Sequence, residues 1–275
     1  MGPLLETDAL DLGFTFVPLE ITAQSHSVTL GYGITDQLTV FASGGYLMKD
    51  PQMANDSVFF FGEAKGIADA EADLLWEVYS NGPYKGHLPM GVIAPLGSVD
   101  NTADFPTAAG EQLPYDMQIG TGAWTIAPGV GGQVMNEVGS VGAQLRGVFA
   151  LTDNDRGWRP GDRIEALLWM AHRFNDNVSG SVGVRAAAAN DIQGIDPDLE
   201  TLRLPGDLAL SFGGNRVDLP VGFNFRMTEG PLAGHRIGVE AVWTVHAKVH
   251  GPRIASDWGI TVGWQTDIGL PGLTF

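Results

Sequence analysis

The chain contains no cysteine, and only 17% of its 275 residues are charged, against about 25% in an average soluble protein. The absence of cysteine excludes a disulfide framework and thiolate chemistry, but it does not distinguish cytoplasm, periplasm and outer membrane. No uninterrupted apolar run approaches the roughly 18 residues that a membrane-spanning helix needs. Any contact with a membrane must therefore be made by strands or from the surface.

Basic residues are also scarce, because 15 Lys and Arg stand against 32 Asp and Glu, a formal net charge of −17. This charge would repel a polyphosphate backbone, and no Lys/Arg-rich run offsets it locally, so we expect no nucleic-acid partner. The opening residues have neither a basic region nor an apolar core of the kind found in a secretory signal. We expect a mature chain from which the signal has been removed, since the strand pattern described next is that of an exported protein.

What the sequence has instead is glycine, proline and strict alternation. There are 38 Gly and 16 Pro, and no stretch has helical periodicity long enough for a helical core. From Arg216 to Met227 apolar and polar or small residues alternate over a dozen positions, and residues 236–248 and 257–265 repeat the pattern. Strands of about ten residues with one apolar and one polar face are typical of a membrane β-barrel.

The same pattern, read along the chain, predicts an all-β, transmembrane, up-and-down antiparallel β-barrel in one domain, residues 1–275. About twelve strands are expected, at 8–18, 25–34, 36–48, 69–79, 84–96, 117–135, 139–151, 162–174, 177–189, 213–227, 233–248 and 256–268. A soluble β-sandwich also alternates, but its strands average only five or six residues. Strand length therefore favours the barrel.

The connections between these strands alternate between short and long. Short ones fall at 35–36, 81–82, 136–137, 175–177 and 228–230, whereas long polar ones fall at 49–68, 97–116, 152–161 and 190–212. Outer-membrane barrels have tight periplasmic turns and long extracellular loops. The pattern predicts both chain termini in the periplasm of a Gram-negative bacterium.

Several local motifs resemble a large bacterial outer-membrane family of transporters, also called phenol meta-pathway degradation proteins. The matching pieces are Tyr32-Gly33-Ile34-Thr35-Asp36, Gly66-Ile67-Ala68-Asp69, Ala94-Pro95-Leu96-Gly97, Gly120-Thr121-Gly122-Ala123-Trp124 and Pro128-Gly129-Val130. Two depart from the family pattern: Ala68-Asp69 replaces Gly-Asp, and Pro95-Leu96-Gly97 replaces Pro-Thr-Gly. The resemblance implies an outer-membrane barrel that passes small, including aromatic, molecules. The terminal Phe275 resembles the aromatic end that barrel assembly machinery recognises.

The polar faces of the strands supply the candidate pore-lining residues. They are Glu71, Asp73, Glu77, Arg146, Arg185, Arg216, Asp218, Arg226, Arg236, Glu240, His246 and Lys248. A barrel of about twelve strands is wider than eight strands, which side chains fill, and narrower than an open porin. We expect a narrow, charged lumen with acids on the 71–77 strand facing bases on the strands between 185 and 236. Such a field would orient and select small solutes.

The expected function is an outer-membrane channel for small solutes, including small aromatic or anionic compounds, with outer-membrane lipid as its surroundings. One alternative is a structural or adhesive barrel whose charges pair and seal the lumen; a second is a soluble β-sandwich binding protein. None of the six His lies in a Gly-x-Ser-x-Gly or His-Glu-x-x-His pattern. We therefore expect no enzyme, no catalytic residue, no metal and no cofactor.

Overall fold

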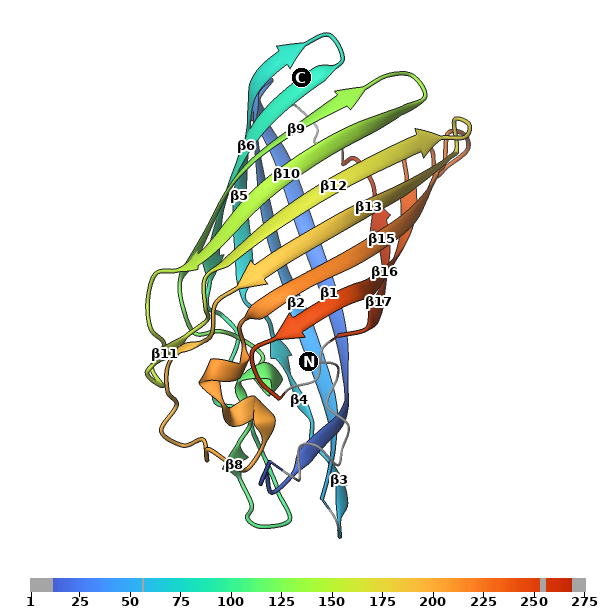
Figure 1. Ribbon diagram of the computed structural model, residues 1–275. Helices are drawn as coiled ribbons and strands as arrows, with labels where there is room; N and C mark the ends of the chain where they lie inside the picture. Colours follow the sequence, from blue (N-terminus) through green and yellow to red (C-terminus); the bar gives the residue numbers. More distant parts are fainter. Residues whose placement is uncertain (1–11, 56, 253–255, 269–275) are drawn as a thin grey trace.

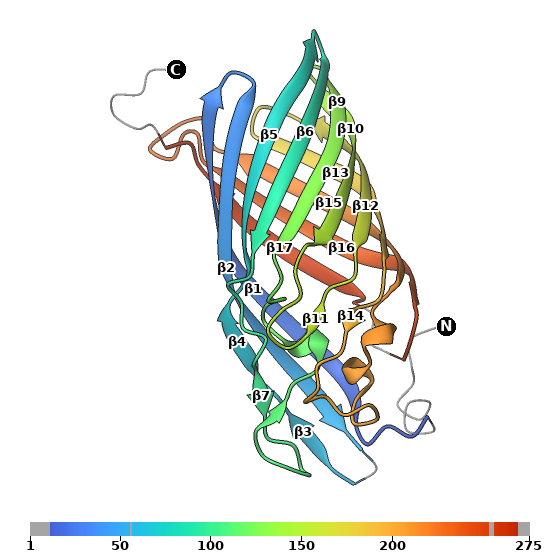
Figure 2. The same ribbon diagram turned by 90° about the vertical axis from the view of Figure 1, so that its left-hand side faces the viewer.

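The computed structural model describes residues 12–55, 57–252 and 256–268 and consists almost entirely of β-strands (Figure 1). Its largest sheet has 13 strands, of which eleven follow one another in chain order, each hydrogen-bonded to the next. They are β1 (Val17–Thr35), β2 (Leu38–Ala54), β5 (Ala70–Asn81), β6 (Tyr84–Ala94), β9 (Thr125–Met135), β10 (Gly139–Ala150), β12 (Arg163–Arg173), β13 (Val178–Ala189), β15 (Gly214–Arg226), β16 (Arg236–Val249) and β17 (Trp258–Gln265). The sheet curls around a lumen, as Figure 2 shows from the side, so the fold is an up-and-down antiparallel barrel wall.

The ends of this path differ from the sequence prediction. Residues 12–16 are not a strand, and residues 17–35 form one strand in place of the strands expected at 8–18 and 25–34; residues 8–11 lie outside the described part. The strand predicted at 117–135 begins only at Thr125. Because eleven antiparallel neighbours form an odd number, β1 and β17 run in the same direction. In the described ranges neither has a strand partner on its outer edge, and the count of twelve stays a prediction.

The short and long connections lie at opposite ends of the sheet, as the sequence predicts (Figure 1). At the lower end of the figure the long connections carry the remaining elements. These are β3 (Phe59–Phe61), β4 (Ala64–Ile67), β7 (Thr102–Ala103), β8 (Glu111–Gln112), β11 (Trp158–Arg159), β14 (Gln193–Gly194) and the 3-10 helices η1 (Tyr115–Met117), η2 (Pro205–Asp207) and η3 (Ala209–Ser211). No helix in the described ranges is long and apolar enough to cross a membrane.

Residues 95–124, 151–162 and 190–213 together form a structured unit at this end, which we call the cap. Its apolar core joins the cap to the extended ends of β1 and β2 and to β4. The buried residues of this core are Phe16, Met53, Ala64, Phe105, Leu113, Met117, Ile119 and Leu204. A second cluster, Val99, Tyr115, Trp158 and Ile192, lies nearer the barrel. The long connections are therefore not simple solvated loops.

The barrel wall, by contrast, has its large apolar side chains on the outside. Leu168 on β12, Phe223 on β15 and Val262 on β17 have relative exposures of 59%, 57% and 69%. Many of the intervening residues point inward and are small, glycine or polar, as the alternation predicts, although Leu75 on β5 and Leu167 and Trp169 on β12 also lie on the inward side. An exposed apolar surface of this extent is costly in water, which is the physical reason to expect a lipid surrounding.

Candidate functional site

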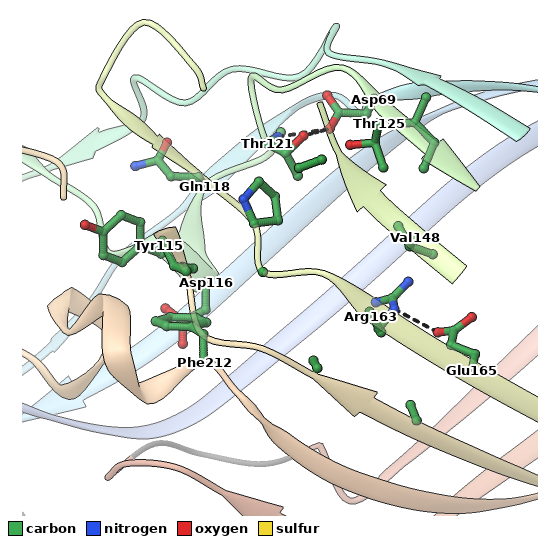
Figure 3. A pocket seen from close by; sticks show the side chains of 18 of the residues that line it. Asp69, Tyr115, Asp116, Gln118, Thr121, Thr125, Val148, Arg163, Glu165 and Phe212 are labelled. Carbon is green, nitrogen blue, oxygen red and sulfur yellow. Dashed lines mark hydrogen bonds and ion pairs between the residues drawn. The ribbon is translucent and has the colours of Figure 1, made fainter. Parts of the chain in front are cut away.

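A cavity of about 930 Å³ lies where the barrel lumen meets the cap. The cap contributes the aromatic side chains Tyr115, Trp158 and Phe212, and the barrel wall contributes charged side chains of β5, β12, β13 and β15. Figure 3 shows Tyr115 and Phe212 on one side of this space and the Arg163–Glu165 ion pair on the barrel strand opposite. The chamber therefore has an aromatic roof and a charged wall.

Asp69, which directly precedes β5, holds the cap segment 95–124 against the barrel at two points (Figure 3). Its Oδ1 accepts a hydrogen bond from Gly97 N (2.9 Å), and its Oδ2 accepts bonds from Thr121 N (3.0 Å) and Thr121 Oγ1 (2.8 Å). The backbones of Gly97 and Gly120 touch, because a Cβ at Gly97 would lie 2.6 Å from Gly120 Cα. Three motifs that are far apart in the sequence thus meet at one carboxylate.

A second tether comes from Lys49 on β2. Its Nζ donates to the backbone carbonyls of Asp116 (2.8 Å) and Gln118 (2.6 Å) in the cap. The Gln118 side chain in turn donates to Leu113 O (2.7 Å) and Asn101 O (3.1 Å) and accepts from Asn101 N (2.9 Å). Bonds from a charged donor are stronger than neutral ones, so this lysine fixes the segment that carries Tyr115.

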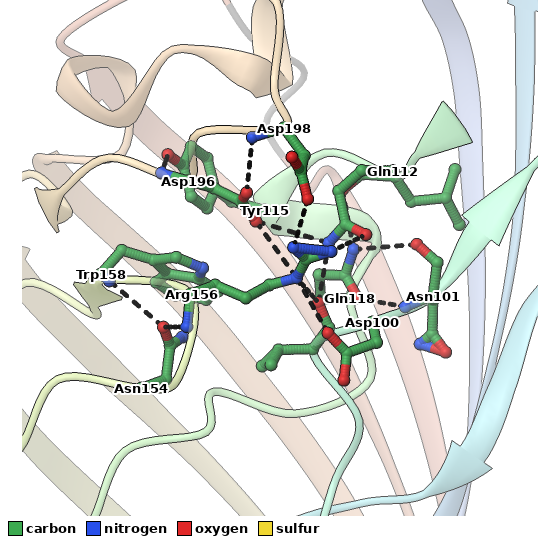
Figure 4. Close-up of polar contacts among 12 residues, drawn as sticks. Asp100, Asn101, Gln112, Tyr115, Gln118, Asn154, Arg156, Trp158, Asp196 and Asp198 are labelled. Atoms are coloured by element: carbon green, nitrogen blue, oxygen red, sulfur yellow. Dashed lines mark hydrogen bonds and ion pairs between the residues drawn. The ribbon is translucent and has the colours of Figure 1, made fainter. Parts of the chain in front are cut away.

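Arg156 joins the three cap segments to one another (Figure 4). Its guanidinium donates to Val99 O (3.2 Å) and Gln112 Oε1 (2.7 Å) of one segment and to Asp198 Oδ2 (2.8 Å) of another. Asp196 belongs to the same network, because its backbone N donates to the Tyr115 hydroxyl (2.9 Å). Burial raises the pKa of the Tyr115 hydroxyl.

A buried ion pair lies deeper in the cap. Arg203 Nε and Nη2 bind the two carboxylate oxygens of Asp207 at 3.0 and 3.1 Å, and Arg203 Nη2 also donates to Gln112 O (2.6 Å). The guanidinium lies 4.6 Å from the centroid of the Phe105 ring. Burial raises the pKa of Asp207 to about 6, although the bonds from Arg203 act in the opposite direction.

In the lumen wall, the structure brings three of the predicted residues together. Arg146 on β10 forms ion pairs with Glu71 and with Asp73 (3.7 Å), both on β5. The two strands are not adjacent, since β6 and β9 lie between them. Gly91 on β6 makes room for these side chains, because a Cβ there would lie 2.7 Å from Asp73 Oδ1 and 2.9 Å from Glu71 Oε1.

The opposite wall holds a second charged group. Arg216 Nε donates to both oxygens of Asp218 (2.6 and 2.9 Å), and Thr244 Oγ1 donates to Oδ1 (2.8 Å). Arg185 on β13 lies beside Asp218 in the strand pairing and also lines the chamber. Throughout the described ranges the Arg185 side chain has no hydrogen bond or ion pair, whereas the Asp218 carboxylate already has three.

The structure corrects the expected inward position of His246 and Lys248. A β-bulge in β16 pairs His246 with Val217 and Ala247 with Arg216, while Asp218 pairs with Thr244. The extra residue shifts the alternation by one position. As a result Ala247 and Val249 line the chamber. His246 is paired with the outward-facing Val217, so His246 and Lys248 lie on the outer side of the wall.

The remaining predicted residues lie toward the end with the tight turns. Glu77 pairs with Lys85 (3.0 Å), and Arg236 donates to Asn224 Oδ1 (2.9 Å). Arg226 lines a separate hollow between the turns, and Glu240 is paired in the sheet with Gly222 and Thr261. The predicted basic strands therefore carry charge at two levels of the barrel, with Arg185 and Arg216 near the cap and Arg226 and Arg236 near the turns.

Sequence reasoning did not identify the cap residues that complete the chamber. Tyr115 and Trp158 gave no signal, and neither did Lys49 on β2, because their roles depend on contacts between distant segments. Asp69 and Thr121 did carry a signal, since both stand in the motifs on which the family resemblance rests. No group of three or more His, Cys, Asp or Glu in the described part of the chain is placed to hold a metal ion.

Comparison with known proteins supports the fold. No family model matches the chain, and no curated protein matches it. Among solved structures, an outer membrane channel from Pseudomonas putida F1 is similar, with a TM-score of 0.58, 14% identity, and coverage of 89% of this chain and 82% of that one. At this identity the likeness shows a shared architecture, that of an outer-membrane barrel.

Proposed function

We propose that this protein is a passive channel of the bacterial outer membrane that passes small solutes, including small aromatic or anionic compounds, through a narrow charged lumen. The observation that carries the proposal is the two-sided wall: eleven neighbouring strands expose many large apolar residues outward, and several of them place charged side chains on the lumen side. The likeness to a solved outer membrane channel supports the same function. The family resemblance of the sequence motifs is the reason to include aromatic compounds.

In this proposal the tight turns lie in the periplasm and the cap lies at the cell surface, as in other barrels of this kind. Outer-membrane lipid surrounds the apolar wall, and the barrel assembly machinery recognises the chain through Phe275, which lies outside the described residues. The pore-lining set is Glu71, Asp73, Glu77, Arg146, Arg185, Arg216, Asp218, Arg226, Arg236 and Glu240. No catalytic residue and no cofactor form part of the proposal.

The alternative with specific support is a barrel with a sealed lumen. The cap lies across one end of the lumen, and several luminal charges are paired with one another. The soluble β-sandwich has no such support, because the strands form one continuous curled sheet rather than two packed sheets.

Single-channel recording in planar bilayers distinguishes the two barrels. Purified protein should produce discrete, uniform current steps in symmetric salt and should let small sugars enter proteoliposomes in a swelling assay. Protein that is folded and inserted, as judged by a heat-dependent shift in gel mobility, yet gives no current steps would contradict the channel and support the sealed barrel.

A further inference from the structure

Two polar groups without partners line the same chamber. Arg185, on the barrel wall, makes no ion pair or hydrogen bond within the described ranges, and Trp158, in the cap, has an Nε1 that is buried without an acceptor. Trp158 is only 3% exposed. A buried donor left without an acceptor costs about 1–3 kcal/mol, and Trp158 Nε1 is closed off from the chamber. Arg185 is only partly buried, so its side chain is the group that a bound molecule can reach.

The charge around Arg185 limits what that molecule can be. The neighbouring carboxylates already have cationic partners, since Asp218 binds Arg216 and Glu165 binds Arg163 at 3.0 Å. Arg185 is therefore the cation on this wall that has no carboxylate of its own to neutralise it. One guanidinium forms a bidentate pair with a planar carboxylate, whereas the acids on either side of it would repel a dianion such as phosphate.

The roof of the chamber is apolar around the Trp158 N–H. The rings of Tyr115 and Trp158 lie edge to face at 4.9 Å, and those of Tyr115 and Phe212 at 5.7 Å. Ile192 completes this surface. Phe212 is the most exposed of the three rings, and an aromatic surface of this kind suits an apolar body.

Accordingly, we propose that the chamber under the cap is a saturable binding site for small monocarboxylates with an apolar body, which bind Arg185 through the carboxylate and the Tyr115–Trp158–Phe212 cluster through the body. The cavity volume of about 930 Å³ lies within the range of small-molecule sites. This inference rests on the proposed function, because the solute reaches the chamber through the lumen.

The test uses the purified full-length protein in a planar bilayer, with benzoate as the probe. Acetate, which lacks the apolar body, and benzyl alcohol, which lacks the charge, serve as comparison probes. Benzoate should reduce the single-channel current saturably, and neither comparison probe should do so at the same concentration. Equal block by acetate, or block that rises linearly without saturating, would overturn the site.

Variants assign the effect to the two groups. Arg185→Gln should raise the half-blocking concentration of benzoate about tenfold or more, since it removes a charge-assisted bidentate pair. Arg185→Lys should give an intermediate value, and Phe212→Ala, which removes the most exposed ring of the roof, should weaken the block by a few fold. Arg173→Gln, at the turn end of β12, is the matched control and should leave the block unchanged. An unchanged block in Arg185→Gln would overturn the assignment.

A binding measurement separates this inference from the proposed function. Benzoate titrated into the detergent-solubilised protein should quench tryptophan fluorescence saturably, and Trp158→Phe should remove most of that change. Normal conductance with no benzoate block and no quenching would overturn the site alone. Saturable quenching in a protein that gives no current would overturn the channel and leave the site in place.

Discussion

The Asp69 carboxylate binds both the backbone N and the hydroxyl of Thr121, 52 positions along the chain, at 3.0 and 2.8 Å. The same carboxylate accepts a bond from Gly97 N. Because Asp69 directly precedes the barrel strand β5 and its partners belong to the cap, these bonds set the position of the cap relative to the lumen. The roof of the proposed chamber depends on them.

Asp69→Asn should loosen the cap without unfolding the barrel. The amide retains Oδ1 for Gly97 but places an NH₂ group opposite Thr121, so the backbone N of Thr121 loses its acceptor and the Thr121 hydroxyl must accept instead of donate. Each bond to the charged carboxylate contributes about 1.5–3 kcal/mol. Hydrogen exchange of peptides covering residues 95–124 should become faster, and exchange of β12 and β13 should not change. Thr121→Ser, which retains the hydroxyl, is the control. Unchanged exchange in Asp69→Asn would show that other contacts hold the cap.

Because Asp207 is buried beside Arg203, we expect the cap to become more stable as the pH falls. Burial raises the pKa of Asp207 from 3.8 to about 6 in the folded cap, so the folded state takes up a proton more readily than the unfolded state. The stabilisation of the folded cap by this proton uptake is fully present below pH 3.8 and is lost as the pH rises through 6. A shift of this size corresponds to about 3 kcal/mol.

The measurement is urea unfolding of the cap at several pH values between 4 and 7.5, followed by tryptophan fluorescence. Asp207→Asn cannot titrate, so its free energy of unfolding should lose most of this pH dependence. Parallel pH profiles for the two proteins would contradict the assignment of the pH effect to Asp207.

Two adjacent residues on β13 test the inside and outside of the wall. Val182 faces outward with 48% of its surface exposed, and Ser181 faces inward. Val182→Arg should lower the free energy of unfolding in lipid by about 2–4 kcal/mol, the range for the destabilisation caused by a cation at the middle of a barrel's lipid face. Ser181→Arg should cost much less, since its side chain can reach water in the lumen. Equal costs would contradict the assignment of faces.

Arg146 tests whether paired charges shape the lumen. Arg146→Gln leaves Glu71 and Asp73 without their cation, so the local potential becomes more negative. The reversal potential in a salt gradient should shift toward cation selectivity, and the shift should shrink as the salt concentration rises. Arg146→Lys, which retains the charge, should shift it far less. An unchanged reversal potential together with a lower thermal stability would favour the sealed lumen.

The sequence by itself determined the class of fold and most of the strands. Strands β10, β12, β13 and β15 lie within two residues of their predicted bounds, because a strand with one lipid face and one luminal face must alternate at period two. The short turns were equally readable, since glycine and asparagine mark them. These properties depend only on neighbouring residues.

The tertiary structure decided what distant residues do together. The bulge in β16 moves His246 and Lys248 out of the lumen, and no local pattern marks it, because the apolar residues on both sides continue the alternation. The bond from Arg146 to Glu71 and the cap contacts of Lys49 join residues 67–75 positions apart. Such contacts form only when the sheet curls and brings non-adjacent strands and loops face to face. The lumen wall could therefore be predicted from the sequence, whereas the chamber beneath the cap could not.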